Sequence, residues 1–135
     1  MQAICVILFY QLLGNTPEAM EAYTGIINRN LADESSLAVA VNNLVALKGP
    51  KDISDSLRKL DRLMEKGNGA QSFQLSNGLE SKLSPKQRET IYTNRVLLLL
   101  HANRMDQVFH LQPCFFLHDG SFLMGVISCW LSIFL

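Results

Sequence analysis

The sequence predicts an all-α protein, a right-handed solenoid of antiparallel helix pairs, and three observations carry this prediction. Apolar anchors recur at a fixed distance, because Ala19, Tyr23 and Ile26 are followed 34 positions later by apolar residues at 53, 57 and 60. Helix start and stop signals separate successive apolar stripes of helical period. Finally, 48% of the 135 residues are hydrophobic and the net charge is zero, a composition that favours a packed core over disorder.

The 34-residue period holds for two helices in each unit. The anchors Ile7 and Tyr10 of the preceding helix also return, as Val41 and Leu44. This period, with two helices per unit, is typical of tetratricopeptide (TPR) repeats. Stacked units of this kind form an extended concave surface that binds other proteins, so we expect a binding scaffold.

The first predicted helix covers residues 3–13 and ends at Gly14-Asn15, where a left-handed conformation is tolerated. An alternative interpretation of this apolar stretch, a secretory signal peptide, is disfavoured because no basic residues precede it. Thr16 as N-cap and Pro17 at the first helical position begin a second helix, which extends to about Arg29.

Asp33 is the expected N-cap of a third helix, which has so little polar surface that we expect it to be the more buried partner of its pair. Lys48-Gly49 ends that helix. Pro50 then begins a fourth helix that extends to about Lys66. Its apolar stripe has clean helical spacing and consists of Ile53, Leu57, Leu60 and Met64.

The period breaks at residues 67–83, a segment rich in glycine and asparagine. Apolar residues alternate on both sides of Asn77-Gly78, a dipeptide that favours a hairpin turn. Two structures remain open for the segment, a β-hairpin and an irregular loop, because an isolated hairpin is marginal in water. Matching residues 37, 41 and 44 to 92, 96 and 99 gives an offset of 55, which is one unit plus a 21-residue insertion.

The array resumes at Ser84, which with Gln87 matches a capping box. A fifth helix follows, Asn103 ends it, and a further helix begins near Arg104. We therefore expect a helical array over residues 1–107, containing the insertion 67–83, and an apolar tail over 108–135 outside the repeat pattern. Asp119 is the only formally charged residue from 107 to 135, with histidine counted as neutral.

The end of the tail offers an alternative function, that of a small tail-anchored TPR adaptor on a membrane. Residues 120–135 carry no acidic or basic side chain. As a helix they would extend about 24 Å, short of the roughly 30 Å of a bilayer core. No basic residue flanks them, so the positive charge that orients membrane segments is missing. Membrane contact through 120–135 is thus disfavoured, and kept as the alternative.

Two runs of sequence point to a particular family. One is the segment 41–49, with the pair Asn42-Asn43, and the other is 83–95, which begins Leu-Ser-Pro-Lys-Gln and follows the polar insertion. Over residues 11–107 the chain resembles the TPR region of the seventy-two-kilodalton subunits of the signal recognition particle. The resemblance implies a cytoplasmic, endoplasmic reticulum-associated scaffold that pairs with the sixty-eight-kilodalton subunit in cotranslational protein targeting to the endoplasmic reticulum. It implies only indirect contact with the particle's RNA, because the family's lysine-rich RNA-binding region is not matched.

The candidate partner-binding residues are polar side chains of the third, fourth and fifth helices. They are Asn42, Asn43, Arg58, Arg62 and Asn94. The basic side chains of the fourth helix are largely paired, since Asp55 lies at helical spacing from Arg58 and Lys59. A clamp for a C-terminal carboxylate is disfavoured, because Ala38 stands where such a clamp needs lysine and Leu97 where it needs a second asparagine.

Catalytic and metal chemistry is not indicated. There is no nucleophile paired with a base, no phosphate-binding glycine loop and no pair of acid and base carboxylates. His110, Cys114 and His118 share helical spacing, but a fourth zinc ligand is missing. Three scattered cysteines do not form a disulfide framework. We therefore expect a non-enzymatic protein with no cofactor and no metal.

Overall fold

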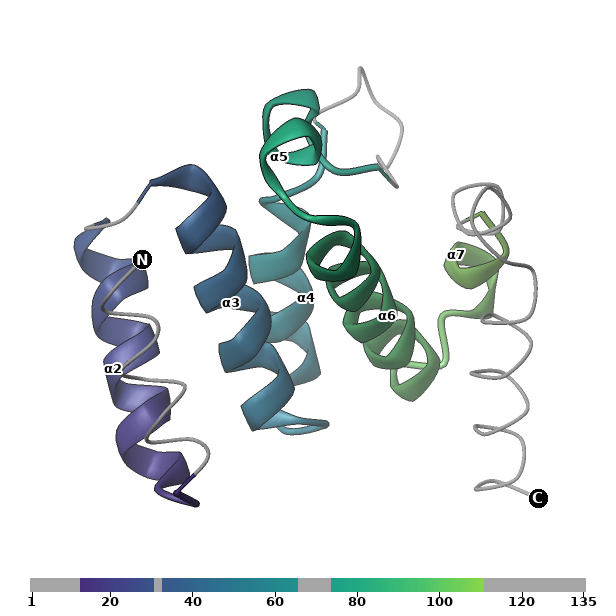
Figure 1. The fold of residues 1–135 in the computed structure, drawn as a ribbon. Coiled ribbons are helices and arrows are strands. Elements are labelled where there is room, and N and C mark those ends of the chain that lie inside the picture. Colours follow the sequence, from purple (N-terminus) through teal and green to yellow (C-terminus); the bar gives the residue numbers. More distant parts are fainter. Residues whose placement is uncertain (1–12, 31–32, 66–73, 111–135) are drawn as a thin grey trace.

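The structure, a computed structural model, describes residues 13–30, 33–65 and 74–110, and these residues form helices, turns and no β-strand. The helices are α2 (Thr16–Arg29), α3 (Glu34–Lys48), α4 (Ile53–Asp61), α5 (Asn77–Lys82), α6 (Pro85–His101) and α7 (Met105–His110). Figure 1 shows α2, α3, α4, α6 and α7 arranged in a row, with the short α5 above it. The all-α prediction is confirmed.

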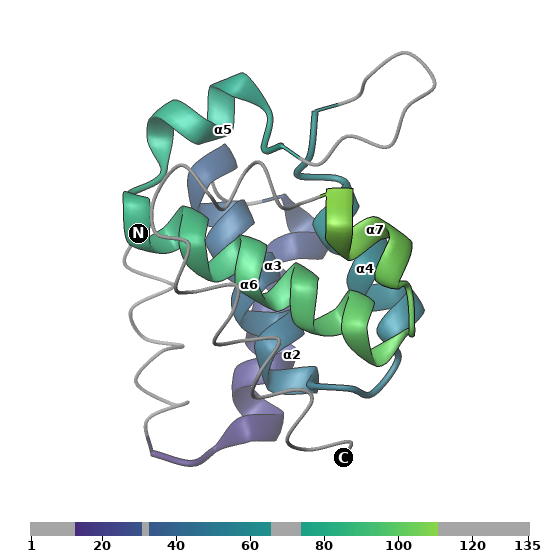
Figure 2. The ribbon, with the colours of Figure 1, turned by 90° about the vertical axis from the view of Figure 1, so that its right-hand side faces the viewer.

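The helices pack largely in their order along the chain. Helix α2 packs on α3, α3 on α4, and α6 on both α3 and α4, while α7 packs on α6. The short α5 lies at one end of α3 and contacts it, as two perpendicular views show (Figures 1 and 2). Each helix thus contacts its near neighbours in the chain, as stacked helix pairs do.

The predicted helix boundaries of α3 and α6 are confirmed by their caps. The Asp33 carboxylate accepts a hydrogen bond from the Ser36 backbone N–H at 3.2 Å. At the start of α6, Ser84 and Gln87 form both hydrogen bonds of the capping box. Gly49 and Asn103 follow the ends of the two helices with φ of 57°, the left-handed region that stops a helix.

Two other predicted boundaries are wrong. The N-cap of α2 is Asn15 rather than Thr16, and no side chain caps the first turn. Helix α4 covers Ile53–Asp61 rather than the longer range from Pro50 to Lys66. It begins late because Asp52 has a positive φ of 55°, and it ends early because the chain turns after Asp61.

A hairpin centred on Asn77-Gly78 is not formed, because these two residues begin α5. Residues 74–76 pair instead with 63–65 upstream, in a short antiparallel contact at Met64 and Leu75. Its two backbone hydrogen bonds are Glu65 N–H to Gln74 O at 2.9 Å and Ser76 N–H to Leu63 O at 3.1 Å. The physical reason lies in three leucines spaced by four, a helical stripe that faces the core: Leu75, Leu79 and Leu83.

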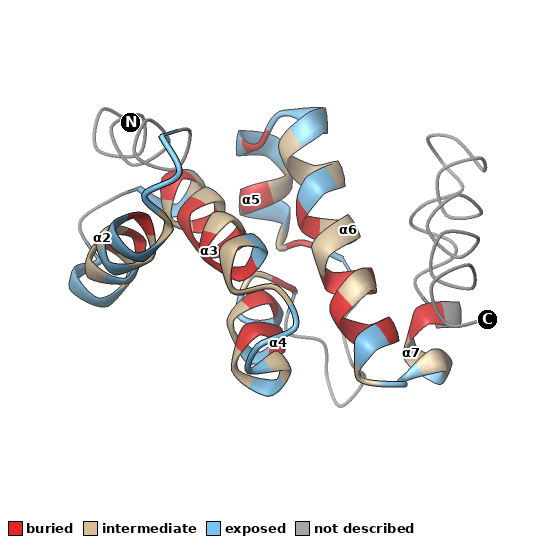
Figure 3. Ribbon diagram, turned by 90° about the horizontal axis from the view of Figure 1, so that it is seen from below, coloured by how far each residue is buried: buried red, intermediate tan, exposed pale blue. Residues whose placement is uncertain are grey.

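Helix α3 contributes to two hydrophobic clusters, one on each side. The smaller cluster joins it to α2 and is built on Ala19, Tyr23, Ile26, Ala40 and Leu44. The larger one extends through α4, α5 and α6 to α7 and includes Val41, Leu57, Leu60, Leu79, Leu99 and Val108. Buried residues follow α3 for most of its length (Figure 3), and they are a larger share of α3 than of its partner α4, so the prediction that α3 is the more buried helix of this pair is confirmed.

Several predictions concern residues outside the described ranges. These are the first helix at 3–13, the first part of the insertion, the metal-like spacing that includes Cys114 and His118, and the membrane contact through 120–135. The division between 1–107 and 108–135 also stays a prediction, although Val108 is buried in the larger cluster. None of the described helices combines the length and the hydropathy that a bilayer crossing requires.

Candidate functional site

The five predicted partner-binding residues lie on α3, at α4 and on α6, and only two of them contact each other. Asn42 and Asn43 are neighbours in sequence, yet successive residues of a helix point about 100° apart. Asn42 therefore reaches α6 while Asn43 reaches α2. The pair of asparagines in the sequence serves two different helix contacts.

The first of these contacts joins α3 to α6. The side-chain N–H of Asn94 donates a hydrogen bond to the side-chain oxygen of Asn42 at 2.9 Å, across 52 positions of sequence. Asn42 is only 5% exposed, and Asn94 is half-buried. The bond replaces water for a nearly buried amide, which would be costly to leave without a partner.

The second contact joins α3 to α2. The Asn43 side-chain N–H donates to the hydroxyl oxygen of Tyr23 at 3.1 Å. Tyr23 is fully buried, and this burial raises the pKa of its phenol, while the bond from Asn43 acts in the opposite direction. The phenol thus stays protonated at neutral pH and anchors α2 on α3.

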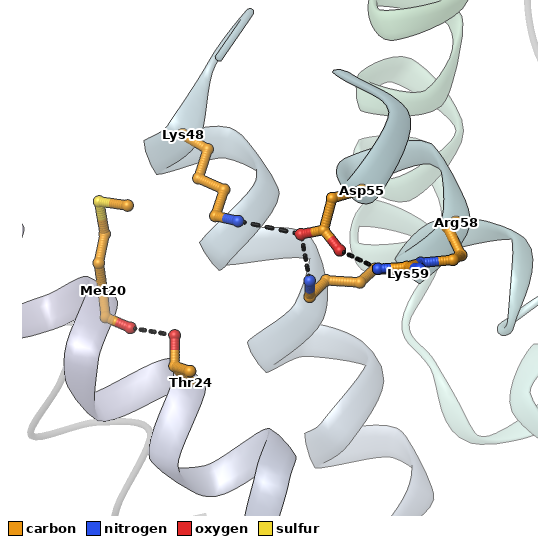
Figure 4. Close-up of polar contacts among 6 residues, drawn as sticks. All are labelled: Met20, Thr24, Lys48, Asp55, Arg58 and Lys59. Atoms are coloured by element: carbon orange, nitrogen blue, oxygen red, sulfur yellow. Dashed lines mark hydrogen bonds and ion pairs between the residues drawn. The ribbon is translucent and has the colours of Figure 1, made fainter. Parts of the chain in front are cut away.

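Charged residues gather where α3 and α4 meet, around Asp55 (Figure 4). Its carboxylate pairs with Lys48 at 3.0 Å, with Arg58 at 2.7 Å and with Lys59. Hydrogen bonds from Lys59, then Arg58 and Lys48, hold the pKa of Asp55 well below its ordinary value. The predicted pairing of Asp55 within its own helix is confirmed, and Lys48 from α3 is a third partner that helical spacing does not reveal.

Arg58 and Arg62 are the predicted cations of the α4 region that remain largely in solvent. The Arg58 side chain is 68% exposed despite its ion pair. Arg62 follows the last residue of α4 and is exposed. The two lie four positions apart, which places them on one side of the helix. They give this side of the molecule positive charge that a partner can contact.

An ion pair between α6 and α4 was missed from the sequence. Arg95 is 3% exposed, and its Nε and Nη2 donate to one oxygen of Asp61 at 3.0 and 2.9 Å. The available signal was a basic residue inside the apolar run of α6. Its partner lies 34 positions upstream, a distance at which spacing within one helix gives no information.

The arrangement supplies amide groups and positive charge on helices fixed by their neighbours. Asn94 borders solvent next to Asn42, and Arg58 and Arg62 lie on the α4 side. Within residues 13–30, 33–65 and 74–110, no three metal-binding side chains come together. Hydrogen bonding and ion pairing with another molecule are the chemistry that these groups offer.

Comparison with known proteins gives consistent matches to a single kind of protein. The human signal recognition particle subunit SRP72 is 33% identical over 97 residues, which is 72% of this chain and 13% of the human protein. The dog protein of that name matches to the same extent. The protein of the same name from Schistosoma mansoni is 28% identical over 96 residues, 71% of this chain and 12% of its own length.

The chain thus spans about an eighth of the length of these relatives. No protein-family model matches it, and no solved structure matches it significantly. The match to the human protein covers 97 residues. This is also the length of the range 11–107, over which the sequence resembles the family. Over about 72% of its length, this chain is therefore related in sequence to SRP72.

Proposed function

We propose that this chain is a non-catalytic protein-interaction scaffold of the signal recognition particle. The single observation that carries the proposal is the 33% identity with human SRP72 over 97 residues. Packing of consecutive helices supports a TPR-like array, since helix α6 contacts both helices of the pair before it. Such an array offers a surface made of successive helices rather than an enclosed pocket.

The partner in this proposal is the sixty-eight-kilodalton subunit of the particle, and the pair acts in the cytoplasm, in cotranslational targeting to the endoplasmic reticulum. Contact with the particle's RNA is indirect, through that subunit. The residues proposed to meet the partner are those predicted from the sequence. They are Asn42, Asn43, Arg58, Arg62 and Asn94. Of these, Arg58 and Arg62 are exposed, Asn43 and Asn94 are half-buried, and Asn42 is buried.

Binding of the two purified proteins tests the proposal. The full chain is mixed with the sixty-eight-kilodalton subunit from the same organism, and the mixture is analysed by size-exclusion chromatography and isothermal titration calorimetry. We expect one complex of equal stoichiometry. The absence of binding at micromolar concentrations, with a helical and cooperatively melting chain, would refute the proposed pairing.

A double charge reversal, Arg58→Glu with Arg62→Glu, locates the contact. We expect it to slow association and weaken the complex most at low salt, because charges at an interface act mainly on the association rate. Lys86→Glu is the control for one reversed charge, since Lys86 is 82% exposed on the separate helix α6. Equal effects per reversed charge would indicate nonspecific electrostatics rather than a site at α4.

A further inference from the structure

An asparagine followed by glycine is prone to rearrange without a catalyst, because glycine has no Cβ to hinder the backbone nitrogen beside the asparagine side chain. The chain contains two such pairs, Asn68-Gly69 outside the described ranges and Asn77-Gly78 at the start of α5. Asn77 and Gly78 are both exposed. A Cβ at Gly78 would meet only the end of the Glu34 side chain, at 3.7 Å, so little of the fold lies over this pair.

The backbone N–H of Gly78 has no hydrogen-bond acceptor among the described residues. The first N–H groups of a helix have no partner within it, and no side chain caps the first turn of α5. In the interior of a helix each N–H is instead held by a carbonyl of the preceding turn. The nitrogen of Gly78 is therefore free to attack the side-chain amide carbon of Asn77.

Asn77 must leave its helical conformation before its side chain reaches this nitrogen, and little opposes that change. Helix α5 has six residues, well below the length at which a helix is stable by itself. Its first turn is closed by two backbone bonds, from Leu79 and Glu80 to the oxygen of Ser76, both of 2.9 Å. Leu79 is the buried residue of α5, so the core contact begins after the reactive pair. The first turn can therefore open locally, without unfolding of the array.

We propose that Asn77 is a site of spontaneous conversion to aspartate and isoaspartate in the folded chain. The nitrogen of Gly78 bonds to the side-chain amide carbon of Asn77, the bond from that carbon to the NH₂ group breaks, and the proton of the nitrogen leaves with that group as ammonia. Water then opens the cyclic imide at one of its two carbonyl carbons, and the ring nitrogen takes back a proton. Opening at the side-chain carbon gives aspartate. Opening at the backbone carbon gives isoaspartate, in which the main chain continues through the former side chain.

The two products differ in their effect on α5. Both add a negative charge near Glu34, the first residue of α3, whose carboxylate pairs with Lys82 of α5 at 3.0 Å. Isoaspartate also lengthens the main chain by one carbon just before Leu79, which is 2% exposed in the larger cluster. The regular backbone bonds of a helix cannot form across that extra atom. Isoaspartate at 77 therefore releases α5 from α3, whereas aspartate, an acid in the first turn of a helix, leaves α5 in place.

The test follows the full chain over time at physiological temperature and pH, in native buffer and in enough urea to unfold it. Peptide mapping by mass spectrometry measures deamidation at 77, and labelling by an isoaspartate-specific methyltransferase measures isoaspartate. Attack through local opening predicts a native rate within about tenfold of the rate in urea. Attack that requires unfolding of the whole domain predicts slowing by roughly a thousandfold or more, and this result would overturn the inference.

Gly78→Ala is the matched variant for the attacking nitrogen. The added Cβ makes ordinary contact at this position, and alanine favours a helix more than glycine does, so we expect the variant to fold. It should lose most of the isoaspartate at 77 over the same interval, because the Cβ hinders the nitrogen. An undiminished rate in Gly78→Ala would show that the Gly78 nitrogen is not the attacking group, and would overturn the mechanism.

The effect on α5 is measured by urea unfolding of chains that carry Asn68→Gln, in which 77 is the one remaining Asn-Gly pair. We expect the midpoint to fall in the aged chain and to recover after repair by the methyltransferase, which converts isoaspartate to aspartate. Asn77→Asp, which has the new charge without the longer main chain, should keep a midpoint near that of the fresh chain. Equal midpoints of the aged and fresh chains would overturn the release of α5 from α3.

Discussion

Helix α3 is held on its two sides by different means. Towards α2 it contributes Ala40 and Leu44 to a small cluster, closed by the hydrogen bond between Asn43 and Tyr23. Towards α4 and α6 it contributes to a cluster that is several helices wide. The first junction uses residues at the expected repeat positions, and the second depends on residues that the repeat pattern does not contain.

Those extra residues belong to the insertion. Leu75, Leu79 and Leu83 are buried in the larger cluster, and the Leu75 backbone N–H donates to the hydroxyl of Tyr92 on α6 at 2.9 Å. Residues 75–83 thus contribute side chains to the core that α3, α4 and α6 share. The comparison teaches that an interruption of a repeat pattern can be part of the core of the repeats that it separates.

The largest expected effect concerns the smaller junction. Leu44 is 1% exposed, and Leu44→Asp would bury a charge without a partner. We expect the free energy of unfolding to fall by about 4 kcal/mol or more, enough to abolish cooperative folding of a marginally stable domain. Circular dichroism during thermal and urea unfolding measures this. A near-wild-type midpoint would show that the α2 junction contributes little to the fold.

The second-largest expected effect tests whether the insertion is part of the hydrophobic core. Leu79→Ala removes a side chain that is 2% exposed in the larger cluster, and we expect a loss of about 2–4 kcal/mol. The control replaces residues 66–73 by a Gly/Ser linker of equal length, which keeps the loop length on which the entropy of loop closure depends. If urea unfolding gives the same stability for Leu79→Ala and the wild type, the insertion lies outside the cooperative core.

Local signals in the sequence predicted most of the helices, because caps and stops act within one turn. Asp33, Ser84 and Gly49 could be placed from their neighbours alone. The insertion was misjudged because two local signals compete there. Asn77-Gly78 favours a turn between strands, while the spacing of Leu75, Leu79 and Leu83 favours a helix, and burial against α3 and α6 decides for the helix.

The candidate site was predictable in its members but not in its contacts. Asn42 and Asn94 were both named from the sequence, yet their hydrogen bond depends on how α3 and α6 align across 52 positions. The pairing of Asp55 with Arg58 and Lys59 is local and was predicted, whereas Lys48 joins only because α3 and α4 turn back on each other. Contacts within a helix follow from spacing, and contacts between helices follow from packing.

A smaller effect compares the tyrosines of the two junctions. Tyr92→Phe leaves the backbone N–H of the fully buried Leu75 without this hydrogen bond, and we expect a loss of about 1–3 kcal/mol. Tyr23→Phe removes the hydroxyl that accepts the hydrogen bond of Asn43. Asn43 is half-buried and its amide can bond to water instead, so we expect a loss of stability of about 1 kcal/mol or less. Urea unfolding of both variants gives the order. The reverse order would mean that the α2 junction depends more on its polar contact than the insertion does.

The smallest effect concerns the carboxylate that joins α3 to α4. Lys59, Arg58 and Lys48 hold the folded-state pKa of Asp55 below its value of about 3.9 in an unfolded chain, so the carboxylate stabilises the fold above that pH. This contribution is lost as the pH falls through the folded-state pKa. The Asp55 side chain is 16% exposed, and we expect Asp55→Asn to cost about 1 kcal/mol at neutral pH, the upper end for ion pairs near the surface.

The difference between Asp55→Asn and the wild type should therefore shrink in urea unfolding at about pH 3 and below, where the unfolded state binds the proton. Glu89→Gln is the matched control, because Glu89 pairs with Lys86, which is 82% exposed, and its loss should cost less than about 0.5 kcal/mol at any pH. A penalty for Asp55→Asn that stays constant with pH would mean that asparagine disturbs the packing of α3 on α4. A penalty that shrinks as the pH is lowered would assign this part of the stability to the charge of Asp55. The ion pairs of Asp55 would then hold α3 on α4 alongside the larger hydrophobic cluster.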